Sequence, residues 1–561
     1  MKTEIKRVIR KYALQNAIKY DSAPRKDAVM SKLMGLHPEL RSKIEEITLL
    51  VEEVLADVAA MSPEQRKAEL QRTAPELIEE LYEKREKERR LPELDVTDGV
   101  VMRIAPNPNG PPTLGTARGI IINHEYAKTY NGKFILRFDD TDPKIKRPML
   151  EAYMWYEEDC EWLGAKPDEI VIASDRIDRY YEYAEKLIKM GKAYVCFCAQ
   201  KTFKQLKDSK KACPHRGRDA KNNLESWKKM LVGEYDEGEA VLRIKTDIKH
   251  KDPALRDWVA FRIIKVAHPR VGDKYQVWPM LDFESAIEDH LLGITHIIRG
   301  KDLMDSEKRQ KFIYEYLGWK YPKTLHWGRI KIHEFGKLST SGMKKAIEEG
   351  LYEGWDDPRL PTIRSFRRRG IQPDAIRNFM IDLGISETDI AVSMDTLYAE
   401  NRKRIDPMAN RYFFVHDPVR MAIKNAPPMV AKAPLHPSID RGVREISVRG
   451  EVFVCKDDAE RTKKGEILRL KDLYNIKIMS SKPLKAEHMG NDLSIIKKGN
   501  IIHWAPVDGV KVEVLAPDRK YKGIGEEGIK SELGNVVQFE RFGFVKIDSV
   551  DDVIGAYFAH K

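Results

Sequence analysis

The sequence predicts a multidomain α/β plus β protein, in which a helical N-terminal part precedes a split Rossmann-type nucleotide fold and C-terminal β-barrels. Three observations carry this prediction. Apolar residues recur at helical spacing before residue 97, a strand–turn–helix–strand pattern runs from Val100 to Phe138, and short β-type runs follow residue 405. The length of 561 residues is too great for one compact core and agrees with several domains.

Composition narrows the classes of function. Hydrophobic residues make up 42% and charged residues 33%, which is typical of a folded globular chain and excludes a mostly disordered one. No apolar run approaches about 18 residues, so neither a membrane span nor a secretory signal is expected. Five cysteines exclude a disulfide scaffold and favour a cytoplasmic location. The net charge of +11 favours a polyanionic partner.

The first domain, residues 1–97, is predicted to be helical. The segment Ser62 to Gln65 combines an N-cap serine, a proline at the first helical position and a capping-box glutamine. One helix face is expected before it, formed by Ile44, Ile47, Val51, Val54, Val58 and Met61. Two roles stay open for this domain: a solvated appendage, or a contact surface for a partner.

The nucleotide fold is expected to begin after Asp98-Gly99. Val100 to Ala105 is an apolar strand, and the Pro/Gly-rich turn at 106–112 excludes a helix. A helix is predicted from Thr113 to Asn131-Gly132, and Phe134 to Phe138 is a second strand. This order is typical of a βαβ unit in a parallel sheet, with its ligand site at the first turn.

The remaining segments predict an interrupted fold followed by β structure. Helices are expected at 148–163, 175–190 and 303–316, with a strand at 295–299 beyond an intervening block. The β-type runs are Arg411 to Val415, Glu451 to Val454, Glu466 to Leu470, Lys511 to Leu515 and Val536 to Phe542. The expected limits are 98–195 and 286–330 for the two halves of the nucleotide fold, 196–285 for the insertion, 331–404 for a loop and helical connection, and 405–561 for the β-barrels.

Two loops have the features of a phosphate site. The turn at 106–116 presents backbone N–H groups at a helix N-terminus, where phosphate is favoured, and Gly115 allows close approach. The loop at 337–341 carries an ammonium group and hydroxyls that can close on a triphosphate. Each loop alone is equally an ordinary connection. The candidate nucleotide-binding residues are Pro106, Asn107, Pro108, Asn109, Gly110, Thr113, Leu114, Gly115, Thr116, Lys337, Leu338, Ser339, Thr340 and Ser341.

Four residues inside the predicted insertion have the spacing of a metal site. Cys196 and Cys198 lie two apart, and so do Cys213 and His215, so each pair shares one face of an extended segment. Three thiolates and an imidazole are typical of a closed, tetrahedral structural zinc site. The alternative is a set of simple core cysteines, which is the interpretation favoured for Cys160 and Cys455.

Taken together, the two loops resemble the signature pair of class I aminoacyl-tRNA synthetases. They stand here as Thr113-Leu114-Gly115-Thr116 and Lys337-Leu338-Ser339-Thr340-Ser341. The blocks that are similar to the glutamyl/glutaminyl subfamily are Arg103 to Gly110, Leu136 to Pro143, Gly293 to Gly300 and Gly354 to Thr362, with Arg367 to Gly370 after the last. The final block resembles glutaminyl enzymes and archaeal or eukaryotic glutamyl enzymes, and the zinc module resembles that of some glutamyl enzymes.

This resemblance implies a function. The expected reaction is ATP-dependent activation of L-glutamate, with Mg²⁺, and transfer of glutamate to the 3′ end of tRNA-Glu. The insertion would bind the acceptor stem, and the β-barrels would bind the anticodon. Charging of tRNA-Gln stays open, and a monomer is expected. By their positions in the signatures, the implied catalytic residues are Thr113, Gly115, Thr116, Lys337 and Ser339.

The signatures depart from the family pattern at three positions. Threonines stand at both histidine positions of the first, Thr113 and Thr116, and at the second lysine position of the other, Thr340. Activation needs no general base, because the substrate carboxylate is already a nucleophile. Stabilisation of the transition state is therefore expected from backbone N–H groups, Lys337 and Mg²⁺. A non-catalytic tRNA-binding protein is the alternative.

The resemblance also separates two substrates. Arg103 and Asp139 occupy substrate-contacting positions of the family, and Asp139 would pair with the α-ammonium group. Arg299 fills a position that is arginine in glutamyl enzymes and small in glutaminyl enzymes, and its charged fork suits a γ-carboxylate. The alternatives are a glutaminyl-tRNA synthetase, or an Arg299 that serves only in a salt bridge with Asp302 or Asp305.

The predicted β region mixes basic and aromatic residues, which permits anticodon binding by stacking and by phosphate contacts. Any single aromatic residue there is expected to lie in the core rather than on a stacking surface. The aromatic residues concerned are Tyr412, Phe413, Phe414, Tyr474, Trp504 and Phe542.

Overall fold

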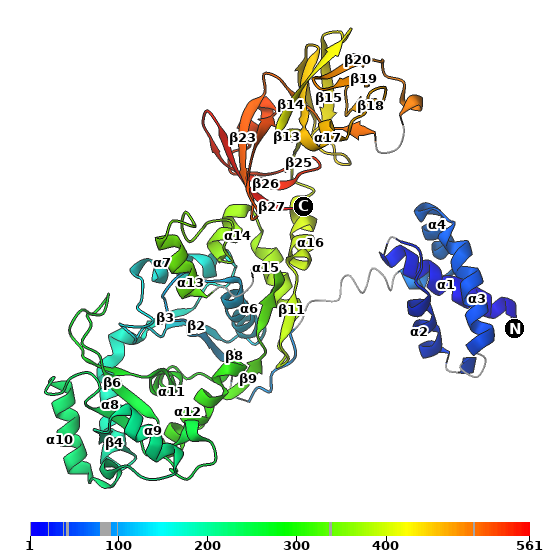
Figure 1. The fold of residues 1–561 in the computed structure, drawn as a ribbon. Helices are drawn as coiled ribbons and strands as arrows, with labels where there is room; N and C mark the ends of the chain where they lie inside the picture. The colour runs from blue at the N-terminus through cyan, green and yellow to red at the C-terminus, as the bar shows by residue number, and fades with distance from the viewer. Residues whose placement is uncertain are drawn as a thin grey trace. The chain divides into compact units, whose positions relative to one another are not determined.

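A computed structural model describes residues 2–20, 22–37, 39–40, 44–78, 91–97, 99–335, 339–496 and 500–561 (Figure 1). The chain divides into two compact units, Met1–Arg90 and Leu91–Lys561. The first unit is helical and the second holds all of the described strands. None of the described helices is long and apolar enough to cross a membrane.

The first unit packs four helices around one apolar core. The helices are α1 Lys2–Tyr20, α2 Lys26–Leu36, α3 Ile44–Ala59 and α4 Pro63–Thr73. The predicted apolar face is buried on α3 at Ile47, Val51, Val54 and Val58, whereas Ile44, which starts the helix, is 51% exposed. Met61, the last residue of the predicted face, lies beyond the end of α3 and is partly buried. The capping box of α4 is complete, because Ser62 and Gln65 each accept a hydrogen bond from the other's backbone N–H.

A three-stranded parallel sheet forms the centre of the second unit (Figure 1). Strand β1 Val101–Ile104 pairs with β2 Lys133–Phe138, which pairs with β3 Glu169–Ile172. Helix α6 Leu114–Thr129 makes the crossover from β1 to β2, as the βαβ pattern predicts. The sheet places the turn after β1 at its carboxyl edge, where ligands of such folds bind.

An antiparallel four-stranded sheet interrupts this fold. Its order is β4-β5-β6-β7, and helices α9 and α10 belong to the same insertion. Helix α7 Leu150–Trp162 lies between β2 and β3 of the parallel sheet, and α8 Ile177–Lys189 leads from β3 to the inserted sheet. The elements that follow are β4 Ala193–Cys196, α9 Gln200–Asp208, α10 Ala220–Leu231, β5 Val241–Ile244, β6 Val259–Ile263, β7 Val277–Pro279 and α11 Leu281–Leu291. The chain then returns to the first sheet, where Thr295 donates its N–H to the carbonyl of Val101.

Parallel strands and short helices lead from the nucleotide fold to the C-terminal part. Strand β8 pairs with β9, and β10 pairs with β11, in both cases parallel. The elements are β8 His296–Gly300, α12 Met304–Leu317, β9 Lys323–Trp327, β10 Ile330–Ile332, α13 Thr340–Glu348, α14 Ile363–Arg369, α15 Pro373–Leu383, β11 Ile390–Val392 and α16 Met394–Ile405.

The C-terminal part consists mainly of two curled seven-stranded sheets, which confirms the predicted α/β plus β fold class. Their orders are β12-β25-β26-β27-β23-β24-β13 and β21-β18-β19-β20-β14-β17-β22, and β15 pairs separately with β16. The strands are β12 Arg411–Tyr412, β13 Phe414–His416, β14 Pro418–Lys424, β15 Met429–Pro434, β16 Val443–Val448, β17 Glu451–Cys455, β18 Ile467–Leu470, β19 Asn475–Ser481, β20 Leu484–His488, β21 Ile501–Ile502, β22 Ala505–Pro506, β23 Val510–Leu515, β24 Lys520–Gly525, β25 Val536–Phe539, β26 Gly543–Val550 and β27 Ile554–His560; the short helix α17 Lys456–Arg461 follows β17.

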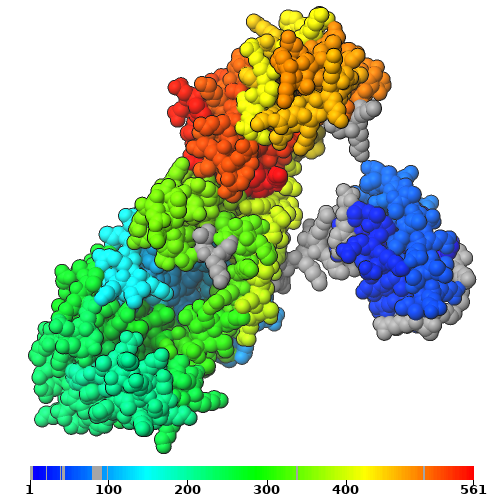
Figure 2. Space-filling view, in the orientation of Figure 1, coloured from blue at the N-terminus to red at the C-terminus, as the bar shows by residue number. Residues whose placement is uncertain are grey.

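The first of these sheets is joined to the helices before it (Figure 2). Arg369, which ends α14, donates from Nε to the carbonyl of Phe558 and from Nη2 to that of Ala559, both on β27. Nδ2 of Asn401, on α16, lies 2.9 Å from Nε2 of His560, on β27. Of the six aromatic residues predicted to lie in the core, Tyr412, Phe413, Phe414, Tyr474 and Trp504 are under 5% exposed, and Phe542 is partly buried against the core that contains Phe414.

Candidate functional site

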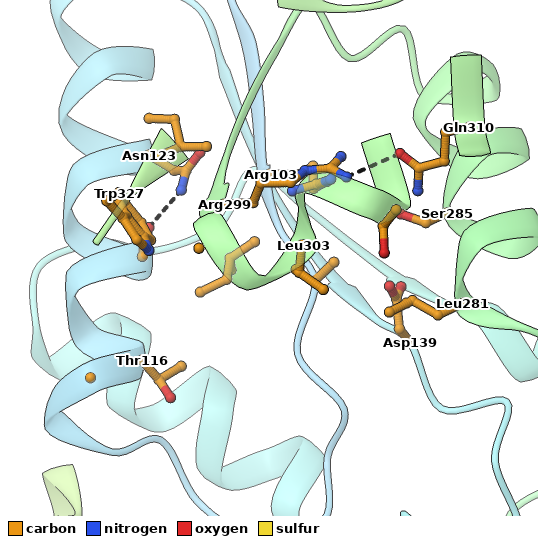
Figure 3. A pocket seen from close by; sticks show the side chains of 17 residues that line it. Arg103, Thr116, Asn123, Asp139, Leu281, Ser285, Arg299, Leu303, Gln310 and Trp327 are labelled. Carbon is orange, nitrogen blue, oxygen red and sulfur yellow. Dashed lines mark hydrogen bonds between the residues drawn. The ribbon is translucent and has the colours of Figure 1, made fainter. Parts of the chain in front are cut away.

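A cavity of about 200 Å³ opens beside the carboxyl ends of β1 and β8 (Figure 3). Arg103 and Arg299 come close together in it, with Gln310 on one side and with Asn123 and Trp327 on the other. The predicted charged pocket residues and Thr116 of the first signature line this cavity. The lining residues are Arg103, Ile104, Ala105, Gly115, Thr116, Gly119, Asn123, Asp139, Leu281, Ser285, Ile298, Arg299, Gly300, Leu303, Ser306, Gln310 and Trp327.

The first signature forms the N-terminus of α6. Thr113 is the N-cap, and its Oγ1 accepts the backbone N–H of Thr116 at 3.3 Å. Leu114 donates its N–H to the carbonyl of Pro361, so the block before α14 closes over this turn. Only Thr113 Oγ1, at 3.7 Å, would meet a Cβ placed on Gly115, which leaves room for a ligand against the backbone.

The second signature lies beside the turn that leads into the first signature. A Cβ placed on Gly110 would lie 2.7 Å from Cγ2 of Thr340 and 3.0 Å from the ring of Trp355, so a larger residue would have to displace one of these side chains. Ser339 caps α13 and accepts the N–H of Gly342 at 3.1 Å. Two members of this signature, Lys337 and Leu338, lie outside the described residues. The loops that the sequence pairs by resemblance are therefore neighbours in space.

Buried charges dominate the opposite end of the cavity. Asp289 on α11 accepts from Nε and Nη2 of Arg103, each at 3.0 Å, and from Nη1 of Arg137 at 2.7 Å. Arg137 on β2 also holds Asp139 through a second bidentate pair at 2.6 and 3.1 Å, and donates to Ser285. The four residues joined by these ion pairs are each less than 10% exposed, so their geometry is fixed before any ligand binds. They are Arg103, Arg137, Asp139 and Asp289.

Arg299 is the exception, because its charge is not neutralised. It is 6% exposed, and its Nη1 donates to Oε1 of Gln310 at 3.1 Å. Its Nε and Nη2 have no hydrogen-bond partner among the residues that the structure describes, and the nearest carboxylate oxygen, on Asp289, is 4.0 Å from Nη2. Burial and the charge of Arg103 lower the pKa of Arg299. Arg299 lines the cavity with the N–H groups of Nε and Nη2 unpaired. A buried guanidinium in this state requires an anionic partner.

The salt bridges that the sequence offered as an alternative for Arg299 do not form. Asp305 pairs with Lys308 at 2.9 Å instead, and the carboxylate beside Arg299 is Asp289. Leu281, at the start of α11, is 40% exposed and lines the cavity.

Several site residues escaped the sequence reasoning. Asp289 and Gln310 lie on amphipathic helices, where an acid or amide gives no signal of what it will face. Tyr321 donates its hydroxyl to the same Oε1 of Gln310 at 2.8 Å, which fixes the amide oxygen towards Arg299. A signal did exist for Arg137, because a charged residue within the apolar run of a buried strand needs a buried counter-charge.

The four candidate metal ligands converge, and their ligand atoms all lie within 4.8 Å of one another. Sγ of Cys196 is 3.9 Å from Sγ of Cys213, and Sγ of Cys198 is 3.4 Å from Nδ1 of His215. A tetrahedron with metal–sulfur bonds of ~2.3 Å has edges of ~3.8 Å, so the donor set and its spacing fit zinc. Outside this cluster Cys160 is buried as expected, whereas Cys455 differs from the prediction: it ends β17 and is only half-buried.

Comparison with known families accounts for this arrangement. The catalytic-domain model of the class I tRNA synthetases (E and Q) matches residues 99–407, and two anticodon-binding-domain models of the same group match 409–491 and 501–548. The chain belongs to the class I E and Q tRNA synthetases. The catalytic match runs through the insertion, so the two parts of this synthetase's nucleotide fold and the inserted sheet form one family unit.

Full-length relatives of this synthetase are named glutamate–tRNA ligase. The protein of Methanothrix thermoacetophila is 59% identical over 564 residues, covering 100% of both chains. That of Methanococcoides burtonii is 61% identical over 564 residues, covering 100% of this chain and 99% of the relative. The Pyrococcus furiosus protein is 49% identical over 573 residues, covering 100% of both.

Proposed function

We propose that this synthetase is a glutamate–tRNA ligase. It would join ATP and L-glutamate to form glutamyl-adenylate and pyrophosphate, and then transfer glutamate to the 3′-terminal ribose of tRNA-Glu. The observation that carries the choice of glutamate is the unpaired, buried fork of Arg299. The shared name of the full-length relatives supports the same choice.

The charge balance of the pocket supports glutamate over glutamine. Arg103, Arg137 and Arg299 face the carboxylates of Asp139 and Asp289, which leaves one positive charge. Burial raises the pKa of Glu284 well above its usual range, which favours the neutral form of this neighbouring carboxyl. Zwitterionic glutamate carries one net negative charge and glutamine none. Only glutamate therefore neutralises the site.

The fork of Arg299 also has the right shape. Nε and Nη2 form one edge of a guanidinium, and a carboxylate can accept both N–H groups in parallel. Gln310 holds the other edge in place through Nη1. The α-ammonium group would meet Asp139, whose oxygens each accept one bond from Arg137 and keep a free lone pair.

Activation at this site needs positioning rather than proton transfer. The α-carboxylate of glutamate would attack the α-phosphate of ATP in line, so the chain's task is to orient both substrates and stabilise the spreading negative charge. The N-terminus of α6, with Gly115 and the hydroxyl of Thr116 at the cavity, would supply donors to the phosphates. Mg²⁺ bound to ATP supplies additional positive charge at those phosphates.

Loss of the Lys337 ammonium is expected to slow activation. This lysine is the one residue of the two signatures that carries a positive charge, and removal of one such donor typically lowers the rate by on the order of 10²–10³. Lys337→Ala should therefore slow tRNA-dependent pyrophosphate exchange by this factor while binding tRNA normally. Lys344→Ala and Lys345→Ala are the matched controls. A near-normal rate in Lys337→Ala would transfer the role to one of those two lysines or to the threonines.

We also propose that Cys196, Cys198, Cys213 and His215 hold a structural zinc ion that orders the insertion. Protein purified without chelators should contain about one zinc per chain, and Cys198→Ser should lose it, because a structural site needs all four ligands. Cys455→Ser, which changes a thiol outside the cluster, should keep the metal. In Cys198→Ser, the rate of tRNA acylation should fall more than the rate of adenylate formation. Equal zinc contents in the two variants would refute the assignment.

Acylation assays test the proposed function directly. Labelled glutamate should be attached to a tRNA-Glu transcript in the presence of ATP and Mg²⁺, and glutamine should not. A parallel assay with tRNA-Gln decides whether the enzyme charges both. We further propose that the protein acts as a monomer in the cytoplasm, and sedimentation equilibrium tests the monomer. Binding of tRNA without acylation or pyrophosphate exchange would instead indicate a non-catalytic tRNA-binding protein.

A further inference from the structure

We infer that His268, in the connection between β6 and β7 of the insertion, is a positioning residue for the amino-acid pocket. Its ring holds the backbone carbonyl of Asp140, the residue that follows Asp139, from outside the nucleotide fold. This inference rests on the proposed function, because it concerns where Asp139 meets the α-ammonium group of glutamate. It assigns to the insertion a second role, besides any contact with tRNA.

The hydrogen bonds of His268 fix the state of its ring. Nε2 lies 2.8 Å from the carbonyl oxygen of Asp140, while Nδ1 accepts the backbone N–H of Arg270 at 3.2 Å and of Val271 at 3.4 Å. The proton therefore sits on Nε2 and is donated to Asp140. Burial lowers the pKa of His268, which keeps the ring neutral in this arrangement.

The ring is also held rigidly by its own domain. His268 is 2% exposed and stacks on Trp278 of β7, with the ring centroids 5.2 Å apart and an interplanar angle of 27°. Its N–H and carbonyl pair with Gly272 and close the turn. Arg147 reaches across from the nucleotide fold and donates to the carbonyl of Ala267 at 2.7 Å. The insertion therefore presents His268 at a fixed place.

The carbonyl that accepts this bond belongs to Asp140, and the residue before it, Asp139, joins the two proposed substrate sites. Asp139 donates its N–H to the carbonyl of Pro106 at 3.0 Å, and its own carbonyl accepts from Nδ2 of Asn107 at 3.0 Å, so it is tied to the ATP-side turn. The carboxylate of Asp140 accepts from the hydroxyls of Tyr153 and Ser174.

Among these hydrogen bonds to Asp139 and Asp140, the one from His268 is the one donated by the insertion. Without it, the Asp140–Thr141 peptide, which follows Asp139 directly, gains freedom on the side away from Pro106. The carboxylate of Asp139 would then sample more positions relative to Arg137. We expect weaker glutamate binding, because the ammonium group must order this peptide on binding. ATP contacts the turn at 106–110, which keeps its other hydrogen bonds, so ATP binding should change little.

The test compares His268→Leu, His268→Asn and His268→Gln in the full-length chain. A glutamine amide nitrogen lies at the same bond separation from Cα as Nε2 and can donate to Asp140, whereas asparagine is too short and leucine has no donor. KM for glutamate in pyrophosphate exchange with saturating tRNA should rise about tenfold in the leucine and asparagine variants, the effect of roughly one hydrogen bond. Glutamine should restore it to within about threefold, and KM for ATP should stay within about twofold in all three.

Controls separate this role from general damage. His250→Leu removes another histidine of the insertion, which contacts Asp252 rather than the pocket, and should leave both KM values unchanged. Zinc content and tRNA affinity should match wild type in every variant. If His268→Leu does not fold, the comparison of asparagine with glutamine decides alone. An unchanged KM for glutamate in His268→Asn, or an equal rise in both KM values, overturns the inference. Absence of glutamate activation by the wild type would overturn the proposed function instead.

Discussion

Replacement of Arg299 by cysteine is expected to raise KM for glutamate strongly and to narrow the preference for glutamate over glutamine. Hydrogen bonds to charged groups contribute roughly 1.5–3 kcal/mol each, and the free edge of Arg299 offers two of them, so an increase of about 10²–10⁴-fold follows. The buried guanidinium rejects glutamine because a neutral amide would leave its charge unbalanced. Cysteine carries no positive charge, so it removes both the unbalanced charge that disfavours glutamine and the hydrogen bonds that favour glutamate.

The measurement is kcat/KM for both amino acids with saturating tRNA, in wild type and in the variant. Arg299→Lys serves as the matched control, since it keeps the charge and loses the fork, and should fall between the two. Folding and ATP binding should be largely spared, because Arg299 makes one hydrogen bond to Gln310 and no close ion pair. An unchanged Glu/Gln ratio in Arg299→Cys would mean that the guanidinium serves only the packing of the pocket.

Substitution of Asp289 by asparagine should have the largest effect on folding. Asp289 is 1% exposed and joins Arg103 to Arg137, so its loss leaves buried cations that repel one another. Breaking a buried ion pair by removing one partner costs about 3–5 kcal/mol in the free energy of unfolding. KM for glutamate should rise as well, because Arg103 and Arg299 lose the carboxylate that separates their charges.

The pH dependence of this loss has a definite sign. Burial raises the pKa of Asp289, but Arg103 and Arg137 outweigh it and hold the pKa well below its usual range. A group of this kind contributes stability above its unfolded pKa of about 4, and the contribution fades as the pH falls below that value. The stability gap between wild type and Asp289→Asn should therefore be full at neutral pH and shrink in acid.

Denaturant titrations at several pH values measure this gap. Asp305→Asn is the control. It breaks an exposed ion pair between Asp305 and Lys308, both on α12, and should change the free energy of unfolding by less than about 1 kcal/mol. A similar small change for Asp289→Asn would mean that the arginines find other partners and that the ion-pair chain does not organise the pocket.

The fold was predictable where its signals are local. The turn after β1 and the helix that follows are visible as a Pro/Gly run before helical periodicity, and the candidate zinc ligands are visible as two pairs two residues apart. Both patterns depend on neighbours in the chain. The same holds for the capping box at Ser62, where each partner is three residues from the other.

The pocket was predictable only in part, because its pairings join distant segments. Sequence proximity suggested Asp302 and Asp305 as partners of Arg299, yet the nearby carboxylate is Asp289 and the bonded partner is Gln310. Both are set by how α11 and α12 pack beside the sheet. The resemblance supplied Arg299 itself. Its unpaired Nε and Nη2, which carry the argument for a γ-carboxylate, became visible only in three dimensions.

One measurement tests the central claim most directly: the ratio of kcat/KM for glutamate to that for glutamine, in acylation of tRNA-Glu by the wild-type enzyme. A site whose buried cation lacks an anion should favour glutamate by ~10⁴ or more, as sites built around a polar contact can do. A ratio near one, or a preference for glutamine, would contradict the account, because Arg299 would then not bind the γ-carboxylate of glutamate.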